Sequence, residues 1–282
     1  MGRTPLVVSI AVLALLTACG PPSPPVIAAR SHPPSQSPSA AASVAAPVQA
    51  GFVDLDEVAP DIVQDIRYHS DHNFVGRPID GYLQPKCVLT QRAAQALAQA
   101  QNSVRGKGFS LKVYDCYRPL RAGEDFKRWA ASPGDDAMKA EFYPGLSKAS
   151  VFADGYVSNG RSAHSRGSTV DLTLVALPVP AQRPFVKGEP LTPCTAPAGQ
   201  RFPDNSIDMG TGYDCFDSRS HTLDARATAP ARQNRLLLRQ LMSDAGFRNN
   251  PSEWWHYSLN DEPFPQDYFD FPITGAASPP KR

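Results

Sequence analysis

The segment 162–174, with the sequence SAHSRGSTVDLTL, most constrains what this chain can fold into. From Val170 to Leu174 apolar and polar residues alternate, which predicts a β-strand with one apolar face for the core and one polar face. Asp171 lies on the polar face, and His164 precedes it by seven residues. That odd separation would place the two side chains on opposite faces of one continuous strand, so we expect the chain to turn at Gly167. Imidazole and carboxylate brought together in this way make half of a zinc site.

The other half of a metal site is predicted in the segment 253–257, EWWHY, whose aromatic residues favour a strand. His256 would complete a set of two histidines and one aspartate. Three protein ligands leave one position for water, as in catalytic rather than structural zinc sites. Glu253 lies three residues before His256. It is the predicted general base, because removing a proton from bound water needs a carboxylate beside the metal that is not itself a ligand.

These residues resemble the zinc D,D-peptidases of peptidoglycan metabolism, which share S-x-H-x-x-G-x-[A/T]-x-D followed later by E-x-[WH]-H. Within that group, the segments SRGSTVDLTL, YDCYRP and MGTGYDCFD resemble the D-alanyl-D-alanine dipeptidases, and the likeness runs from about Phe52 to Phe271. Thr169 departs from the family, which usually has alanine there. Cys116 and Cys215 also depart, standing where small or aromatic residues are common, which suggests an oxidised, exported version.

The local elements indicate a mixture of helices and strands. The resemblance implies an α+β fold, with a small, mostly antiparallel sheet packed with helices as in hedgehog proteins and D,D-peptidases. It implies one Zn²⁺ per chain, bound by His164, Asp171 and His256, and hydrolysis of the D-alanyl-D-alanine dipeptide to two D-alanines by a metal-activated water. Arg118 precedes Pro119 and is therefore held extended. The resemblance gives its guanidinium the role of stabilising an oxyanion.

Contacts with the substrate are expected from Ser162, Asp214 and Tyr82, with Asp214 facing the substrate ammonium group. A turn-capping role for Asp214 and a packing role for Tyr82 stay open. Two other functions also stay open. One is a D,D-carboxypeptidase that trims peptidoglycan stem peptides, and the other is a non-catalytic, zinc-bearing module that binds the cell wall.

The amino-terminal part predicts export. Residues 1–18 have a short basic start, an apolar run and small residues before Cys19, as in a bacterial lipoprotein signal peptide. Residues 19–50 are rich in proline, serine and alanine and are expected to form a disordered tether. The peptidase domain is predicted over residues 51–275, with a loose tail at 276–282. We therefore expect a protein that is lipid-anchored through Cys19 at the bacterial cell envelope and faces the periplasm.

Cysteine usage supports that location. Four cysteines besides the one at the signal cleavage site predict two disulfides in an exported protein. Of three possible pairings we favour Cys87–Cys116, which links the start of a helix to the end of a strand, and Cys194–Cys215, which closes a long loop.

The formal net charge of +1, without a basic cluster, gives no reason to expect a nucleic-acid partner. The oligomeric state is left open.

Periodicity and breakers predict further elements of the domain. We expect helices at 90–104, 119–131 and 232–245, and strands at 109–116 and 254–259. His69 and His72 are predicted to be solvent-exposed loop residues rather than metal ligands. Arg235 is predicted to lie on the exposed side of its helix.

Overall fold

The computed structural model describes Gly2, residues 49–158 and residues 161–274. The predicted signal peptide apart from Gly2, the lipidation site Cys19, the tether up to residue 48 and the tail 276–282 lie outside these residues. Within the described ranges, no helix combines the length and the apolar character that crossing a membrane requires. The described ranges cover nearly all of the domain predicted over residues 51–275.

Two sheets form the centre of the domain. The larger sheet has the order β2-β4-β5-β7-β6, formed by Val63–Gln64, Phe109–Asp115, Thr169–Ala176, His256–Leu259 and Phe247–Asn249. β2 runs parallel to β4, and every other neighbouring pair in this sheet is antiparallel. The smaller sheet pairs β1, Phe52–Asp54, with β3, Val88–Thr90, in antiparallel fashion. The predicted α+β class with a small, mostly antiparallel sheet is thus confirmed.

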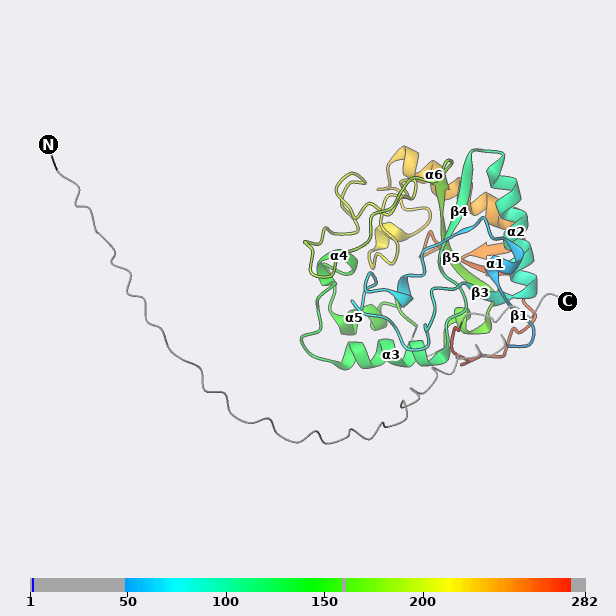
Figure 1. Cartoon of the computed structure of the whole chain (residues 1–282), viewed down its shortest axis with the longest axis horizontal. Helices are drawn as coiled ribbons and strands as arrows, with labels where there is room; N and C mark the ends of the chain where they lie inside the picture. Colours follow the sequence, from blue (N-terminus) through cyan, green and yellow to red (C-terminus); the bar gives the residue numbers. More distant parts are fainter. Residues whose placement is uncertain (1, 3–48, 159–160, 275–282) are drawn as a thin grey trace, which may run out of the picture. The chain divides into compact units, whose positions relative to one another are not determined.

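Six α-helices and three 3₁₀ turns surround these strands within the described ranges. The helices are α1 Leu55–Val58, α2 Gln91–Arg105, α3 Leu120–Ala131, α4 Lys139–Phe142, α5 Lys148–Ala153 and α6 Ala229–Asp244, and the turns are η1 Arg67–His69, η2 Ala163–Arg166 and η3 Ser218–Ser220. Helix α2 packs on β4, α6 packs on β6, and the two helices contact each other. Figure 1 shows α2 and α6 beside the sheet, and α3, α4 and α5 in another part of the domain.

A β-bulge changes which face of the sheet β4 presents at its end. Leu111 and Val113 pair with the apolar residues of β5, so these side chains share the core face. The register then shifts between Val113 and Asp115, and Asp115 pairs with Asp171. One extra residue in β4 moves each later side chain of the strand to the opposite face of the sheet. The bulge therefore turns the Asp115 carboxylate toward the same polar face as Asp171.

Two expectations about polar residues are wrong. Arg235 is fully buried, not exposed, and its guanidinium donates to the backbone oxygens of Met209, His221 and Arg219. These carbonyls are supplied by a loop distant in sequence, so helix periodicity alone did not reveal them. His72 is also buried, with 4% of its surface exposed.

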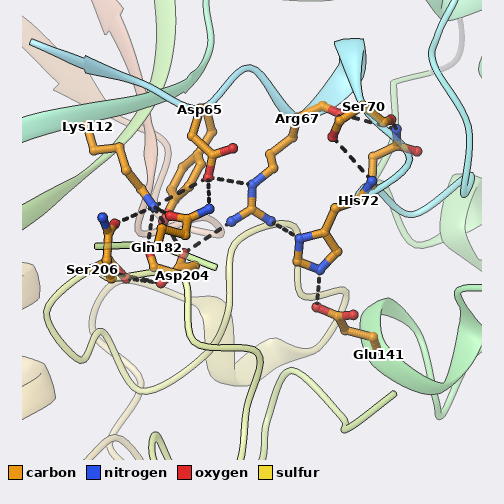
Figure 2. Close-up of polar contacts among 12 residues, drawn as sticks. Asp65, Arg67, Ser70, His72, Lys112, Glu141, Gln182, Asp204 and Ser206 are labelled. Carbon is orange, nitrogen blue, oxygen red and sulfur yellow. Dashed lines mark hydrogen bonds and ion pairs between the residues drawn. The ribbon is translucent and has the colours of Figure 1, made fainter. Parts of the chain in front are cut away.

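His72 belongs to a buried network of charged side chains (Figure 2). Arg67 donates to its Nδ1 at 2.9 Å, and because a guanidinium can only donate, the proton of His72 lies on Nε2, 2.9 Å from Glu141 Oε1. Burial lowers the pKa of His72, and the positive charge of Arg67 lowers it further, so this histidine is neutral. At the other end of the network, Asp204 bonds Arg67 and lies beside the buried ammonium of Lys112.

We expect Asp204→Asn to destabilise the domain by about 3–5 kcal/mol at pH 7, because it leaves the buried Lys112 and Arg67 charges less compensated. Burial raises the pKa of Asp204, but Lys112 and Arg67 outweigh it and hold the pKa below its ordinary value of 3.8. Because the pKa is lower in the folded state, the ionised carboxylate contributes its full stability above pH 3.8. This contribution is lost as the pH falls through the lower, folded-state pKa. Denaturant unfolding from pH 7 to about pH 2 should therefore show a weaker acid dependence in the variant.

The exposed Asp267 offers a control for this measurement, and Asp267→Asn should leave the free energy of unfolding unchanged within about 0.5 kcal/mol. If Asp204→Asn behaved like the control, the network would not stabilise the fold.

Both predicted disulfides are present. Cys87 pairs with Cys116 and Cys194 pairs with Cys215, with Cα atoms 5.3 Å and 5.5 Å apart. The second bridge joins cysteines separated by 21 positions in the sequence, for which chain entropy alone predicts about 3 kcal/mol of stabilisation.

Replacing Cys194 and Cys215 together by serine should therefore lower the melting temperature by roughly 6–12 °C, as a domain of this size loses about 2–4 °C per kcal/mol. Calorimetry of the variant, with the unreduced native protein as reference, measures this shift. An unchanged melting temperature would mean that the loop is ordered without the bridge.

Candidate active site

Strand register brings two of the predicted metal ligands together. Asp171 on β5 is the direct antiparallel partner of His256, the first residue of β7. His256 Nδ1 lies 3.3 Å from Asp171 Oδ1. Because paired residues of adjacent strands point to the same face, ordinary sheet geometry is enough to place both groups on the polar face.

The third predicted ligand reaches the same point through the expected turn. His164 lies in η2, which ends at Gly167 with a left-handed φ of 77°. A Cβ at this glycine would lie 2.0 Å from the ring of Phe52, so conformation and packing both demand glycine. His164 Nδ1 lies 2.7 Å from the backbone oxygen of Cys116. With that nitrogen donating to the carbonyl, Nε2 faces Asp171 with its lone pair free.

The residues present fit a metal ion. One ligand atom from each of His164, Asp171 and His256 lies within 4.8 Å of the other two. His164 Nε2 and Asp171 Oδ1 are buried without a hydrogen-bond partner in the described residues. Buried polar atoms are almost always satisfied, and a cation would satisfy both at once. Two imidazoles and one carboxylate are ligands that Zn²⁺ accepts.

Glu253 lies beside this group but outside it. Its Oε2 is 3.1 Å from His256 Nδ1 and accepts from Asn250 Nδ2 at 3.0 Å. The side chain retains 17% exposure, whereas that of Asp171 retains 2%. Burial lowers the pKa of His256, but its contacts with Asp171 and Glu253 outweigh this and raise the pKa to about 10. The site thus collects negative charge, which favours a cation.

Arg118 is held by the carboxylate of Asp115, which was not among the predicted site residues. Asp115 Oδ2 lies 2.9 Å from Arg118 Nε and 2.8 Å from one of its terminal nitrogens. The same terminal nitrogen is 3.6 Å from Asp171 Oδ2. The guanidinium also lies over the ring of Tyr68, 4.9 Å from its centroid. These contacts place the Arg118 guanidinium beside the metal group, as predicted.

Tyr82 is placed differently from the expectation. It is 3% exposed, and its hydroxyl donates to Asp115 Oδ1 at 2.6 Å. It does not line the cavity beside the metal group. Its contact with the substrate is thus not supported, because an aromatic residue in a polar loop gives no sign of which buried carboxylate it will meet. Instead, Tyr82 fixes the carboxylate that orients Arg118.

A cavity of about 160 Å³ opens over the metal group. Its wall includes the three predicted ligands, Glu253 and Arg118, and also the predicted substrate residues Ser162 and Asp214. Ser162 Oγ accepts the backbone N–H of His164 at 3.3 Å. The structure thus brings together every predicted site residue of the domain except Tyr82.

Asp214 has an unusual conformation and environment. Its φ is 55°, a left-handed value that non-glycine residues rarely adopt. Its carboxyl accepts from Tyr68 at 2.8 Å. Burial raises the pKa of Asp214 well above its usual range, and the nearby charge of Asp171 raises it further. An ammonium group bound beside it would favour the charged form.

Three residues of the site were missed from the sequence. Asp115 orients Arg118, Tyr68 bonds Asp214, and Tyr213 donates to Asp171 Oδ2 at 3.1 Å. Asp115 and Tyr213 lie inside the quoted segments YDCYRP and MGTGYDCFD, so a signal was available for them. Tyr68 lies in a short turn without a recognisable pattern.

The open group of two histidines and one aspartate, with a free carboxylate and an arginine in one cavity, defines a metal-dependent hydrolase site. Comparison with known proteins gives the family. The family model for D-Ala-D-Ala dipeptidase matches residues 48–178 and 201–274. The D-alanyl-D-alanine dipeptidase of Enterococcus faecium is 36% identical over 226 residues, covering 80% of this chain and all of that protein.

Two more relatives are also D-alanyl-D-alanine dipeptidases. The D-alanyl-D-alanine dipeptidases of Enterococcus faecalis and Streptomyces coelicolor are 38% and 41% identical, and each alignment covers 79% of this chain and 98% of the relative. The chain belongs to the D-alanyl-D-alanine dipeptidase family of metallopeptidases.

The segment 179–200 lies outside the family match. It supplies Cys194 to the second disulfide, Gln182 to the buried network and Phe185, whose ring stacks on His72 at 4.5 Å. Cys215, the partner of Cys194, directly follows Asp214 in the cavity wall. The additional segment is thus tied to one side of the active site.

Proposed function

We propose that this protein hydrolyses the D-alanyl-D-alanine dipeptide to two D-alanines with one bound Zn²⁺. The observation that carries the proposal is the pair of unpartnered buried atoms, His164 Nε2 and Asp171 Oδ1, beside Glu253 in a small cavity. The named relatives, matched over nearly their whole length, support the choice of substrate.

His164, Asp171 and His256 would hold the ion, which supplies a Lewis acid that lowers the pKa of water towards ~7 and polarises a carbonyl. Glu253 acts as general base: it takes a proton from the attacking water and passes it to the leaving amine. Its position supports this role, since it touches His256 and keeps partial contact with solvent.

Arg118 stabilises the negative charge that develops on the carbonyl oxygen of the scissile peptide bond. Its guanidinium is already oriented by Asp115, so little reorganisation is needed as that charge forms. The contact of Tyr82 with Asp115 in turn limits the freedom of the carboxylate. Asp214 would meet the substrate ammonium, and Ser162 lines the same cavity.

An acidic group in the cavity favours the dipeptide over a peptidoglycan stem peptide. Asp214 lies in the cavity wall and provides a partner for a free amino end. A D,D-carboxypeptidase must accept a substrate in which that amino end continues as a peptide. The stem-peptide reaction is the alternative that the following experiment addresses.

Release of D-alanine should be measured with D-Ala-D-Ala and with a pentapeptide that ends in D-Ala-D-Ala. We expect cleavage of the dipeptide and at most slow cleavage of the pentapeptide. Cleavage of the pentapeptide at the higher rate would move the assignment to a carboxypeptidase. Binding of zinc without cleavage of either would favour a wall-binding module.

We also propose that the enzyme is exported and lipid-anchored through Cys19, facing the periplasm. The signal-like start, the proline-rich segment after it and the two disulfides support this location. There it would salvage D-alanine during cell-wall turnover. Labelling with a fatty-acid analogue in cells expressing the native chain or Cys19→Ala would test the anchor, and equal labelling would contradict it.

A further inference from the structure

We propose that Arg161 binds the free carboxylate of the substrate and makes the site selective for an unblocked carboxyl end. This inference rests on the dipeptidase function proposed above. Arg161 is exposed and lines the catalytic cavity next to Ser162. A residue that is both exposed and part of the cavity wall lies where the cavity meets solvent, so its guanidinium is accessible to an entering ligand.

Within the described residues, Arg161 has no acidic partner and is available to bind a carboxylate. Arg118, the other arginine in the wall, is bound by Asp115 at 2.8 Å. All aspartates and glutamates of the chain lie within 49–158 and 161–274. None of them forms a salt bridge with Arg161, whereas the nearby Arg166 is paired with Glu262 at 2.8 Å. The cavity therefore presents one arginine that no acidic side chain neutralises.

An aromatic ring supports Arg161 in this position. Its guanidinium lies over Tyr268, 5.1 Å from the ring centroid. The Tyr268 hydroxyl is itself 3.4 Å from a terminal nitrogen of Arg166, which Glu262 holds with two hydrogen bonds of 2.8 Å and 2.9 Å. Tyr268 is thus anchored from a second direction. A guanidinium stacked on such a ring keeps its N–H groups free for a carboxylate.

The substrate has charges that match the cavity. A dipeptide has an ammonium on one side of the scissile bond and a carboxylate on the other, on α-carbons only ~3.8 Å apart. Both charged ends must therefore find partners in the same small cavity. Asp214 offers an acidic group for the ammonium, and Arg161 offers a planar pair of donors that suits the carboxylate. Arg118 is left for the scissile carbonyl oxygen.

The test compares D-Ala-D-Ala with its carboxamide, D-Ala-D-Ala-NH₂, in the native enzyme, Arg161→Ala and Arg161→Lys. Losing a charge-assisted pair should raise KM for the dipeptide about 10–100-fold in Arg161→Ala, with kcat within about 3-fold. KM for the carboxamide should not change. Arg161→Lys should recover part of the loss. Arg232→Ala, at an exposed position of α6 outside the cavity, is the matched control.

An unchanged KM for the dipeptide in Arg161→Ala would overturn the assignment. An equal rise for both substrates would overturn it too, since Arg161 would then act through the local structure. Calorimetric binding of both ligands to Glu253→Gln and to the double variant with Arg161→Ala separates this inference from the proposed function. If Glu253→Gln binds the dipeptide more tightly than the carboxamide and the double variant does not, the inference is supported whether or not turnover occurs. If Glu253→Gln shows no such preference, or the double variant keeps it, the inference is contradicted.

Discussion

Glu253→Ala should lower kcat for D-Ala-D-Ala by about 10³-fold while the protein still binds one zinc per chain. A positioned general base contributes roughly 10²–10⁴-fold to catalysis. Glu253 touches His256 Nδ1 at 3.1 Å but does not belong to the group of three ligands. Its removal therefore takes away the proton acceptor and leaves the cation site in place.

The measurement pairs kcat with zinc content by elemental analysis. Glu253→Gln keeps the shape of the side chain and should show a similar loss, because an amide cannot accept the proton. Glu124→Ala, an exposed position on α3, should change neither quantity. Turnover of Glu253→Ala at the native rate would remove this residue from its proposed role.

Asp171→Ala should abolish both zinc binding and activity. Asp171 is the central residue of the group, lying 3.2 Å from His164 Nε2 and 3.3 Å from His256 Nδ1. Loss of an outer hydrogen-bond partner of a ligand typically costs 10–100-fold in metal affinity, so losing the ligand itself should cost more than about 100-fold. Competition with a chromogenic chelator measures this affinity.

Tyr213→Phe provides a graded comparison, because it removes only the hydroxyl that donates to Asp171 Oδ2 at 3.1 Å. We expect its zinc affinity to fall about 10–100-fold. Zinc affinity of Asp171→Ala equal to that of the native protein would mean that the metal binds elsewhere.

Local sequence rules predicted the parts of the site that depend on local geometry. The alternation around Asp171 defined β5, and the odd separation from His164 required the turn that Gly167 makes. These two predictions rest on the two-residue period of a strand and on the conformational freedom of glycine. Both properties depend only on residues that are close in the sequence. Pairing of Asp171 with His256 then follows from one antiparallel ladder.

The parts that could not be predicted depend on contacts between distant segments. A bulge in β4 turns Asp115 toward the site, and no alternation pattern reveals such an insertion. Arg235 has the spacing of an exposed helix residue, yet a loop covers it with backbone oxygens. Tyr82 looked free to contact substrate, but a carboxylate from another element accepts its hydroxyl.

The most direct test of the central claim is zinc titration of the metal-depleted enzyme with D-Ala-D-Ala as substrate. If His164, Asp171 and His256 form the catalytic centre, D-alanine release should be absent after chelation, rise linearly with added zinc and level off at one zinc per chain. Undiminished release after complete removal of the metal, or saturation only at two zinc ions per chain, would contradict the account.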